Sequence, residues 1–393
     1  GPEAPPPPAP SPPAGIAVLP FEHDSRGRRG EYFSDGLTEE ITDALSRVRG
    51  LRVIARTSAF AFKGSRVPAP EIGRRLGVSH LLEGSVRRSG GSLRVSVRLV
   101  EAGTGSLLWS GRYDREIGDV FAVQDEIARA VVDALRVELA GEGGALVRGT
   151  TADPEAHALY LRGRAAWYTR TPEGLEEALA FFGRALERDP GYALAHIGLA
   201  DALNMLGAFD YGVRPPGEVY PRARGAAERA LALRPGLAEA HTALANVLLN
   251  HEWDWEGAAR AFRHALRLNP GYAVAYHWYS LYLGAVARHA EALDAVRRAR
   301  ELDPMSLVMG TALARQLYFA RDFAAAAREY RALLAQDPAF LPARLGLVLT
   351  LAQAGAADEA VAELEGAPAA PGGPRPVQLA LLGHVQGRAG RRA

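Results

Sequence analysis

The sequence predicts an α/β sandwich domain over residues 15–140, followed by an all-α superhelix of paired helices over residues 155–393. Three observations predict this division. In the first part, apolar runs of strand length alternate with runs at helical spacing, whereas the second part shows helical spacing alone. In the second part, prolines recur at 190, 235, 270, 304 and 338. Between the two parts, "GEGG" at 141–144 is typical of a linker, which we place at 141–154.

The chain begins with a proline-rich stretch, "GPEAPPPPAPSPPA", at residues 1–14. Proline fixes an extended backbone, so these residues are predicted to form a semi-rigid spacer that does not join a hydrophobic core. A spacer in this place leads us to expect a further part of the protein before it.

The α/β domain is predicted to follow the order β-α-β-α-β-β-β-α. The expected elements are strands at 15–21 and 51–56, helices at 33–48 and 69–78, and a closing helix at 120–135. Three strands are expected within 81–113, since Leu93, Val95, Val97 and Leu99 alternate with polar residues and "SGG" and "AGTG" supply turns. These three strands would form an antiparallel meander.

The helical part is predicted from residues that keep step with the prolines. The last two intervals between the prolines are 34 residues, the length of a tetratricopeptide helix pair. Twelve residues before each proline stands an alanine, at 178, 223, 258, 292 and 326. Such small residues allow the second helix of a pair to press against the first, and the proline ends the pair. We count about six pairs and a truncated seventh.

Composition excludes several classes of protein. A net charge of +1 gives no reason to expect nucleic-acid binding. The absence of cysteine excludes thiolate metal sites and disulfides, and no apolar run is long enough for membrane insertion. No phosphate-binding glycine loop, GxSxG or HExxH motif occurs, so we expect no catalytic residues, cofactor or metal. The compartment stays open, on either side of the bacterial inner membrane.

Several motifs of the first part resemble one known domain. "IAVLPF", "YFSDGLTEEITDAL", "RVIARTSAFAFKG", "LGVSHLLEGSVRR" and "LLWSGRYDREIGDVFAVQDEIARAV" are similar to the TolB amino-terminal-like domain. Tetratricopeptide repeats commonly follow that domain. The resemblance implies a sensor or scaffold region placed after a signalling output module, which can be an adenylate cyclase, a serine/threonine kinase or a winged-helix DNA-binding domain.

A small-ligand site is one candidate in the α/β domain. Arg56, Thr57, Ser58 and Lys63 follow the second predicted strand, and ligands tend to bind at strand ends in open α/β sheets. The alternative is a structural turn or a surface for a partner.

The concave groove of the repeats is the other candidate site. Counting from the prolines places these residues on the first helix of each pair, facing the groove: Asp201, Asn204, Thr242, Asn246, Asn250, His277, Thr311, Arg315 and Tyr318. Amides mixed with apolar and charged groups suit a protein or peptide segment. The alternative is that the groove packs against the chain's own α/β domain.

Two aromatic clusters are predicted to be packing rather than chemistry. Tyr276 and Tyr279 should lie where two helices of one pair meet, and Trp253 and Trp255 in "HEWDWEG" should cap the core of another pair. The function predicted is therefore that of a non-catalytic, protein-binding sensor or scaffold region. Two alternatives remain: a nucleotide- or small-ligand-binding regulatory domain, and a purely structural module that forms an oligomer.

Overall fold

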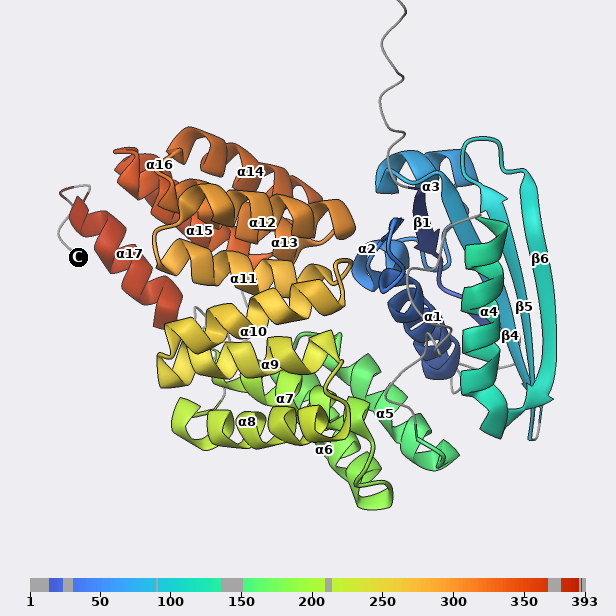
Figure 1. Cartoon of the computed structure of the whole chain (residues 1–393). Helices are drawn as coiled ribbons and strands as arrows, with labels where there is room; N and C mark the ends of the chain where they lie inside the picture. The colour runs from blue at the N-terminus through green and yellow to red at the C-terminus, as the bar shows by residue number, and fades with distance from the viewer. Residues whose placement is uncertain are drawn as a thin grey trace, which may run out of the picture.

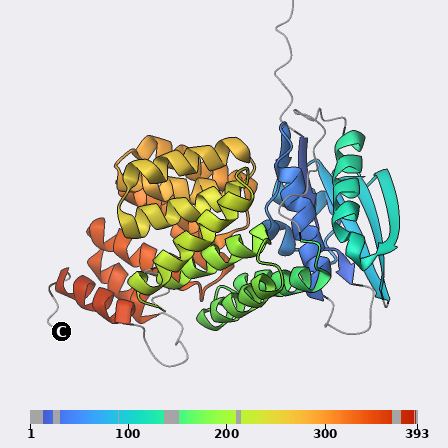
Figure 2. The same ribbon diagram turned by 60° about the horizontal axis from the view of Figure 1, so that its bottom comes forward.

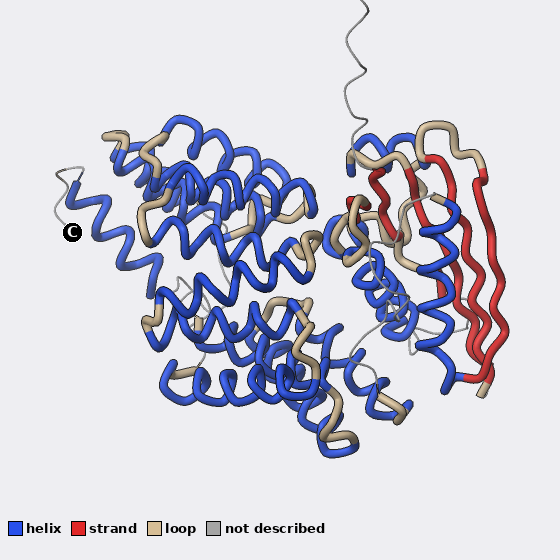
Figure 3. Tube along the Cα trace, in the orientation of Figure 1, coloured by secondary structure: helices blue, strands red, loops and turns tan. Residues whose placement is uncertain are grey.

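The computed structural model describes residues 14–23, 31–89, 91–135, 151–208, 214–366, 376–388 and 390. The predicted spacer therefore lies outside the described residues except for Ala14, and the predicted linker does so except for residues 151–154. All the strands gather in one part of the molecule, and the other part is a helical array (Figure 3).

The amino-terminal part is a mixed sheet with helices. Its strands are β1 (Ala14–Val18), β2 (Glu22–His23), β3 (Leu51–Val53), β4 (His80–Ser89), β5 (Ser92–Glu101) and β6 (Leu107–Glu116). Its helices are α1 (Glu31–Ser46), α2 (Arg56–Phe60), α3 (Ala69–Leu76) and α4 (Val120–Ala134), with a 3-10 turn, η2 (Ile117–Asp119), before α4. The observed order therefore contains two short elements, β2 and α2, that the sequence analysis did not predict.

The strands lie in the order β3-β1-β4-β5-β6, with β2 also paired to β4. β1 runs parallel to β3 and β4, whereas β4, β5 and β6 form the antiparallel meander that the alternating pattern predicted. Alternate residues of β1 enter different cores: Ile16 and Val18 pack with α1 and α4, and Ala17 packs with α3. Helices therefore cover both faces of the sheet.

The second part consists of helices packed in consecutive pairs (Figure 1). They are α5 (Pro154–Trp167), α6 (Pro172–Arg188), α7 (Ala193–Gly207), α8 (Pro216–Leu233), α9 (Ala238–Val247), α10 (Trp255–Leu268), α11 (Ala273–Ala285), α12 (His289–Leu302), α13 (Leu307–Phe319), α14 (Phe323–Gln336), α15 (Leu341–Gln353), α16 (Ala357–Glu365) and α17 (Pro376–Arg388). A π-turn, η3 (Leu248–Glu252), follows α9. Among the described residues, α5–α16 make six pairs and α17 packs on α15 and α16.

The residues in step with the prolines pack as predicted. All five alanines placed twelve residues before a proline are fully buried. Phe182, eight residues before Pro190, is also fully buried between α5 and α7. A Cβ atom at Gly198 would lie 2.5 Å from the Phe182 ring, so only glycine permits this contact. Small residues thus set the helix spacing, and the aromatic ring fills the remaining gap.

One of the two predicted aromatic clusters packs as expected, and the other does so only in part. Tyr279 stacks on Tyr282 with ring centroids 5.8 Å apart, and both belong with Tyr276 to one apolar cluster. Trp255 joins the same cluster, but Trp253 does not cap it: its side chain is 68% exposed. The prediction for Trp253 is wrong because this residue ends the π-turn with φ 59°, which turns its side chain away from the pair.

The hydrophobic core continues from the sheet into the helical array. Residues of β1, β5, α1 and α4 form one cluster with residues of α5, α6 and α7, among them Tyr160 and Phe182. At the centre of this contact, the side chain of Leu161 fills the space above Gly36 of α1. Because of this continuity, the α/β part and the first repeats are packed as one body.

Candidate functional site

α1 and α2 lie between the sheet and the helical array, as the two views in Figures 1 and 2 agree. Polar residues of both helices contact the array beside the apolar contacts already described. A group of buried ion pairs holds one side of this interface, and hydrogen bonds to the turn between α12 and α13 hold the other.

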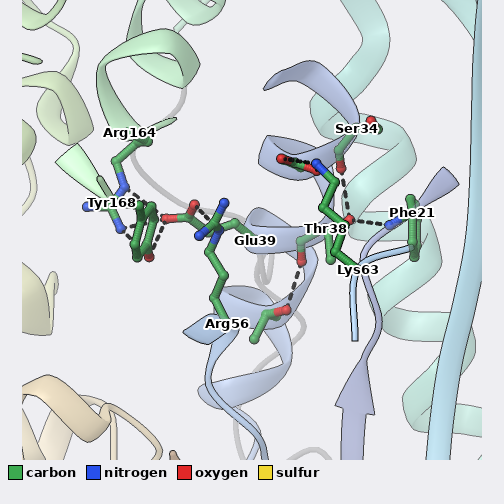
Figure 4. Close-up of polar contacts among 10 residues, drawn as sticks. Phe21, Ser34, Thr38, Glu39, Arg56, Lys63, Arg164 and Tyr168 are labelled. Atoms are coloured by element: carbon green, nitrogen blue, oxygen red, sulfur yellow. Dashed lines mark hydrogen bonds and ion pairs between the residues drawn. The ribbon is translucent and has the colours of Figure 1, made fainter. Parts of the chain in front are cut away.

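Glu39 of α1 is the centre of the first group (Figure 4). The side chain of Arg164, from α5, donates to Glu39 Oε1 at 2.8 and 2.5 Å, and the Tyr168 hydroxyl donates at 3.1 Å. Arg56 Nε lies 3.2 Å from Glu39 Oε2, and its guanidinium stacks on the Tyr168 ring at 3.8 Å. Since Glu39 is only 6% exposed, two arginines from different parts of the chain depend on one buried carboxylate.

Glu40 and Arg47 extend the interface along α1. His157 Nε2 of α5 donates to Glu40 Oε1 at 2.9 Å, and the Gln124 amide of α4 also donates to Glu40. Arg47 pairs with Glu239 of α9 at 2.9 Å. One helix of the α/β part therefore contacts both the first and the third repeat.

Ser58 of α2 enters the turn between α12 and α13. In three other repeats, the Asp or Asn before the proline accepts a hydrogen bond from the backbone N–H two residues later; these residues are Asp189, Asn269 and Asp337. In this turn, Asp303 Oδ1 instead accepts from the backbone N–H and the hydroxyl of Ser58, at 3.0 and 2.5 Å. The N–H of Met305 donates to Ser58 Oγ at 2.8 Å. Ser58 thus takes the place of the turn's own acceptor and docks the α/β part there.

A cavity of about 440 Å³ lies between these two contacts. Its wall from the α/β part comes from α1 and from Val53 to Thr57. The array supplies residues of α5, α7, α9, α11 and α13 and of the turns beside them, but none of α6, α8, α10, α12 or α14. The concave surface of the repeats therefore faces the α/β part across the cavity. Its volume is that of a small-molecule site.

The structure separates the four residues predicted as a small-ligand site. Arg56 and Thr57 line the cavity. Ser58 is fully buried in the turn contact described above. Lys63 lies at the surface instead, where its ammonium contacts Asp35 at 2.7 Å. Arg56 and Thr57 thus remain candidates for ligand contact, although Arg56, like Ser58 and Lys63, also has a structural partner.

The predicted groove residues divide in a similar way. Asp201, Asn204, Asn246 and His277 line the cavity. Thr242 and Thr311 are buried within the array, and Asn250 is exposed. Arg315 and Tyr318 are half-buried on α13, beyond the cavity. The α/β part therefore covers one end of the predicted groove and leaves the end at Arg315 and Tyr318 uncovered.

Burial shapes the electrostatics of the cavity. Loss of water raises the pKa of Asp201 to about 7, although Arg164 and Arg170 oppose this change. Burial, together with repulsion from Glu39, raises the pKa of Asp43 to about 7. The pKa of His277 falls to about 3 through burial and the positive charge of Arg315, so His277 is neutral near pH 7. These surroundings therefore favour the neutral forms of Asp201, Asp43 and His277.

Sequence reasoning missed the residues on the facing side of the interface. Glu39, Glu40 and Asp43 belong to the helix predicted at 33–48, and no motif there singled them out. Arg164 and Glu239 belong to α5 and α9, and the repeat pattern gave them no special position. No sequence signal pointed to them, because the burial of α1 on nearly all sides, polar residues included, is seen only in the structure.

Other kinds of site find no support in the part of the chain that the structure describes. No group of three His, Asp or Glu side chains there is arranged to hold a metal ion. No helix of that part combines the length and apolar content needed to cross a bilayer.

The helical array consists of TPR-like helical repeats, and its last part matches the tetratricopeptide repeat. The family model of that repeat matches residues 317–383, which reach from α13 to α17. Among solved structures, the chain is similar to a thermophilic TPR protein of Thermus thermophilus, with 20% identity, 50% of this chain and 98% of that chain covered, and a TM-score of 0.42. It is also similar to YrrB, a TPR protein with an unusual peptide-binding site, with 22% identity, 47% and 90% coverage and a TM-score of 0.33.

A curated relative of this chain bears the name "Putative adenylate cyclase 3" and comes from Rhizobium meliloti (strain 1021). The two are 46% identical over 197 residues, which make up 50% of this chain and 33% of that protein. The chain therefore matches about a third of the relative's length.

Proposed function

We propose that this chain is a non-catalytic regulatory region of a larger bacterial signalling protein, and that its repeats bind a peptide segment of a partner through α13 and α15. The amino-terminal motifs similar to the TolB amino-terminal-like domain and the match to a cyclase-named relative support this placement. The enzyme activity of such a protein would belong to its other parts.

Exposed apolar side chains at groove positions of α13 and α15 carry the proposal. Phe319 is 45% exposed and Leu349 is 38% exposed. They lie fifteen and eleven residues after their repeat prolines, at positions that face the groove in such repeats. Arg315 and Tyr318 are their polar neighbours on α13. A surface with apolar anchors beside polar groups is typical of a peptide-binding interface.

The covered end of the groove supports the choice of this segment. Asp201, Asn204 and Asn246 line a cavity whose volume suits a small molecule, because α1 lies over them. A peptide would therefore bind where the α/β part ends, over α13 and α15.

Selection of peptides from a random displayed library against the whole chain tests the proposal. We expect the selected peptides to bind the wild type and to lose at least tenfold in affinity with Phe319→Ser plus Leu349→Ser. The control is Leu107→Ser plus Leu108→Ser, since these side chains are 58% and 48% exposed on β6, away from the repeats. Equal binding to the first double variant and the wild type would contradict the proposal.

A further inference from the structure

The cavity between the α/β part and the repeats contains buried polar atoms without partners. Asn204 is 6% exposed and Asn246 is 4% exposed, and both line the cavity. Among the described residues, Oδ1 of each amide accepts no hydrogen bond. Oε2 of Glu239, which also lines the cavity, has no hydrogen-bond donor either. Such orphans are rare in folded proteins because each costs free energy, so they point to a missing ligand.

The charged groups of the cavity divide into paired and unpaired ones. The guanidinium groups are all engaged: Arg47 pairs with Glu239, Arg56 and Arg164 pair with Glu39, and Arg170 stacks on Trp167 at 3.9 Å. Of the other lining carboxylates, Glu40 binds His157 and Asp303 binds Ser58. Within the described ranges, Asp43 and Asp201 have neither an ion pair nor a side-chain hydrogen bond. Two carboxylates are therefore left without a partner.

The two unpaired carboxylates both influence Tyr272. Burial raises the pKa of Tyr272, which also lines the cavity, and the negative charges of Asp201, Glu239 and Asp43 add to this effect. Both carboxylates line the same cavity, although Asp43 belongs to α1 and Asp201 to α7.

Most of the free atoms are acceptors; Trp167 Nε1 and Arg56 Nε, whose residues also line the cavity, are donors without a hydrogen-bond partner in the described part of the chain. Two amide oxygens and three carboxylates require a ligand that donates hydrogen bonds and carries positive charge. A metal ion does not fit, since the acidic residues do not form a metal-holding group in the described part of the chain. A quaternary ammonium ion does not fit either, because it has no N–H to donate. Aromatic rings such as Tyr272 and Trp278 would pack on the apolar part of an organic cation.

We propose that this cavity binds a small aliphatic diamine, with ammonium groups donating to Asp43 and Asp201 and to the amide oxygens of Asn204 and Asn246. The ligand bridges the two parts of the chain, because Asp43 belongs to the α/β part and the other three residues belong to the repeats. This site is separate from the peptide surface on α13 and α15.

Calorimetry and thermal unfolding of the whole chain with putrescine test the inference. 1,4-Butanediol has the same chain length without charge, and choline has charge without N–H donors. We expect putrescine to bind at least tenfold more tightly than either compound and to raise the unfolding temperature as its concentration rises. Binding of putrescine no tighter than that of butanediol, or choline binding as tightly as putrescine, would overturn the proposal.

Variants separate lost contacts from lost structure. Asp201→Asn keeps the shape and removes the charge, so we expect it to weaken putrescine binding at least tenfold while it raises the unfolding temperature of the free protein at pH 8. Asp294→Asn is the matched control, as its carboxylate is 78% exposed on α12 and should leave putrescine binding unchanged. Unchanged binding with Asp201→Asn would also overturn the proposal. The peptide assay with Phe319 and Leu349 is independent, so failure of either proposal leaves the other standing.

Discussion

Removal of the Glu39 charge is the most direct test of how the two parts are held together. Glu39→Gln leaves the guanidinium groups of Arg56 and Arg164 buried without a counter-charge (Figure 4). Breaking a buried ion pair by the loss of one partner costs about 3–5 kcal/mol. We expect the free energy of unfolding to fall by about this amount, since Glu39 also accepts from Tyr168.

Urea denaturation followed by circular dichroism measures this change, and tryptophan fluorescence adds a local report, since Trp167 contacts the Arg164 guanidinium at 4.8 Å. Glu71→Gln is the matched control, because Glu71 also contacts two arginines, Arg74 and Arg75, but at the surface. We expect no measurable effect from the control. The reasoning is refuted if Glu39→Gln shifts the urea midpoint no more than Glu71→Gln does.

Three further predictions concern stability. Since burial raises the pKa of Asp201 from 3.8 to about 7, the folded state holds a proton that the unfolded state releases, so stability is lost as pH rises from 4 to 7. In Asp201→Asn, the fall in the free energy of unfolding between pH 4 and pH 8, measured by urea denaturation, should therefore be smaller by up to about 4 kcal/mol. A pH profile equal to that of the wild type would contradict this prediction. Gln316 is fully buried and neither of its amide atoms has a partner among the described residues, so Gln316→Met should raise the free energy of unfolding by about 1–2 kcal/mol in urea denaturation, whereas a fall would show a needed hydrogen bond. Gly198→Ala should cost about 1–3 kcal/mol through overlap with the Phe182 ring, while Gly183→Ala, with open space at its Cβ, should stabilise by up to about 1 kcal/mol; equal effects would argue against this packing.

The repeats could be predicted well from sequence because their packing is local and periodic. An alanine such as Ala258 contacts the neighbouring helix of its own pair, so its position relative to Pro270 fixes its environment. His196 and His241 show the same regularity: each contacts, through Nε2, the carbonyl of the proline six residues earlier, at 3.0 and 2.9 Å. The strand alternation of the α/β part is local in the same sense.

The site could be predicted only in part because it depends on contacts between distant segments. The proline count placed Asp201 and His277 toward the groove, and both line the cavity, but nothing in the count places α1 above them. Glu39 and Arg164 are 125 residues apart, and neither belongs to a motif that would indicate the other. The sequence also does not predict that Asp303 accepts from Ser58 rather than from its own turn, since a proline follows Asp303 just as it follows Asp189.

The docking of the α/β part also changes how the repeats share stability. In an ordinary solenoid, each repeat contacts only its neighbours, so unfolding spreads along one dimension from either end. In this chain, α1 and α2 bind α5, α9 and the turns before α11 and α13, which couples repeats that do not touch one another. Separation of α1 and α2 from the array must therefore break contacts at four places along it. Hydrogen exchange should be slow and concerted there, and unfolding should begin at α17.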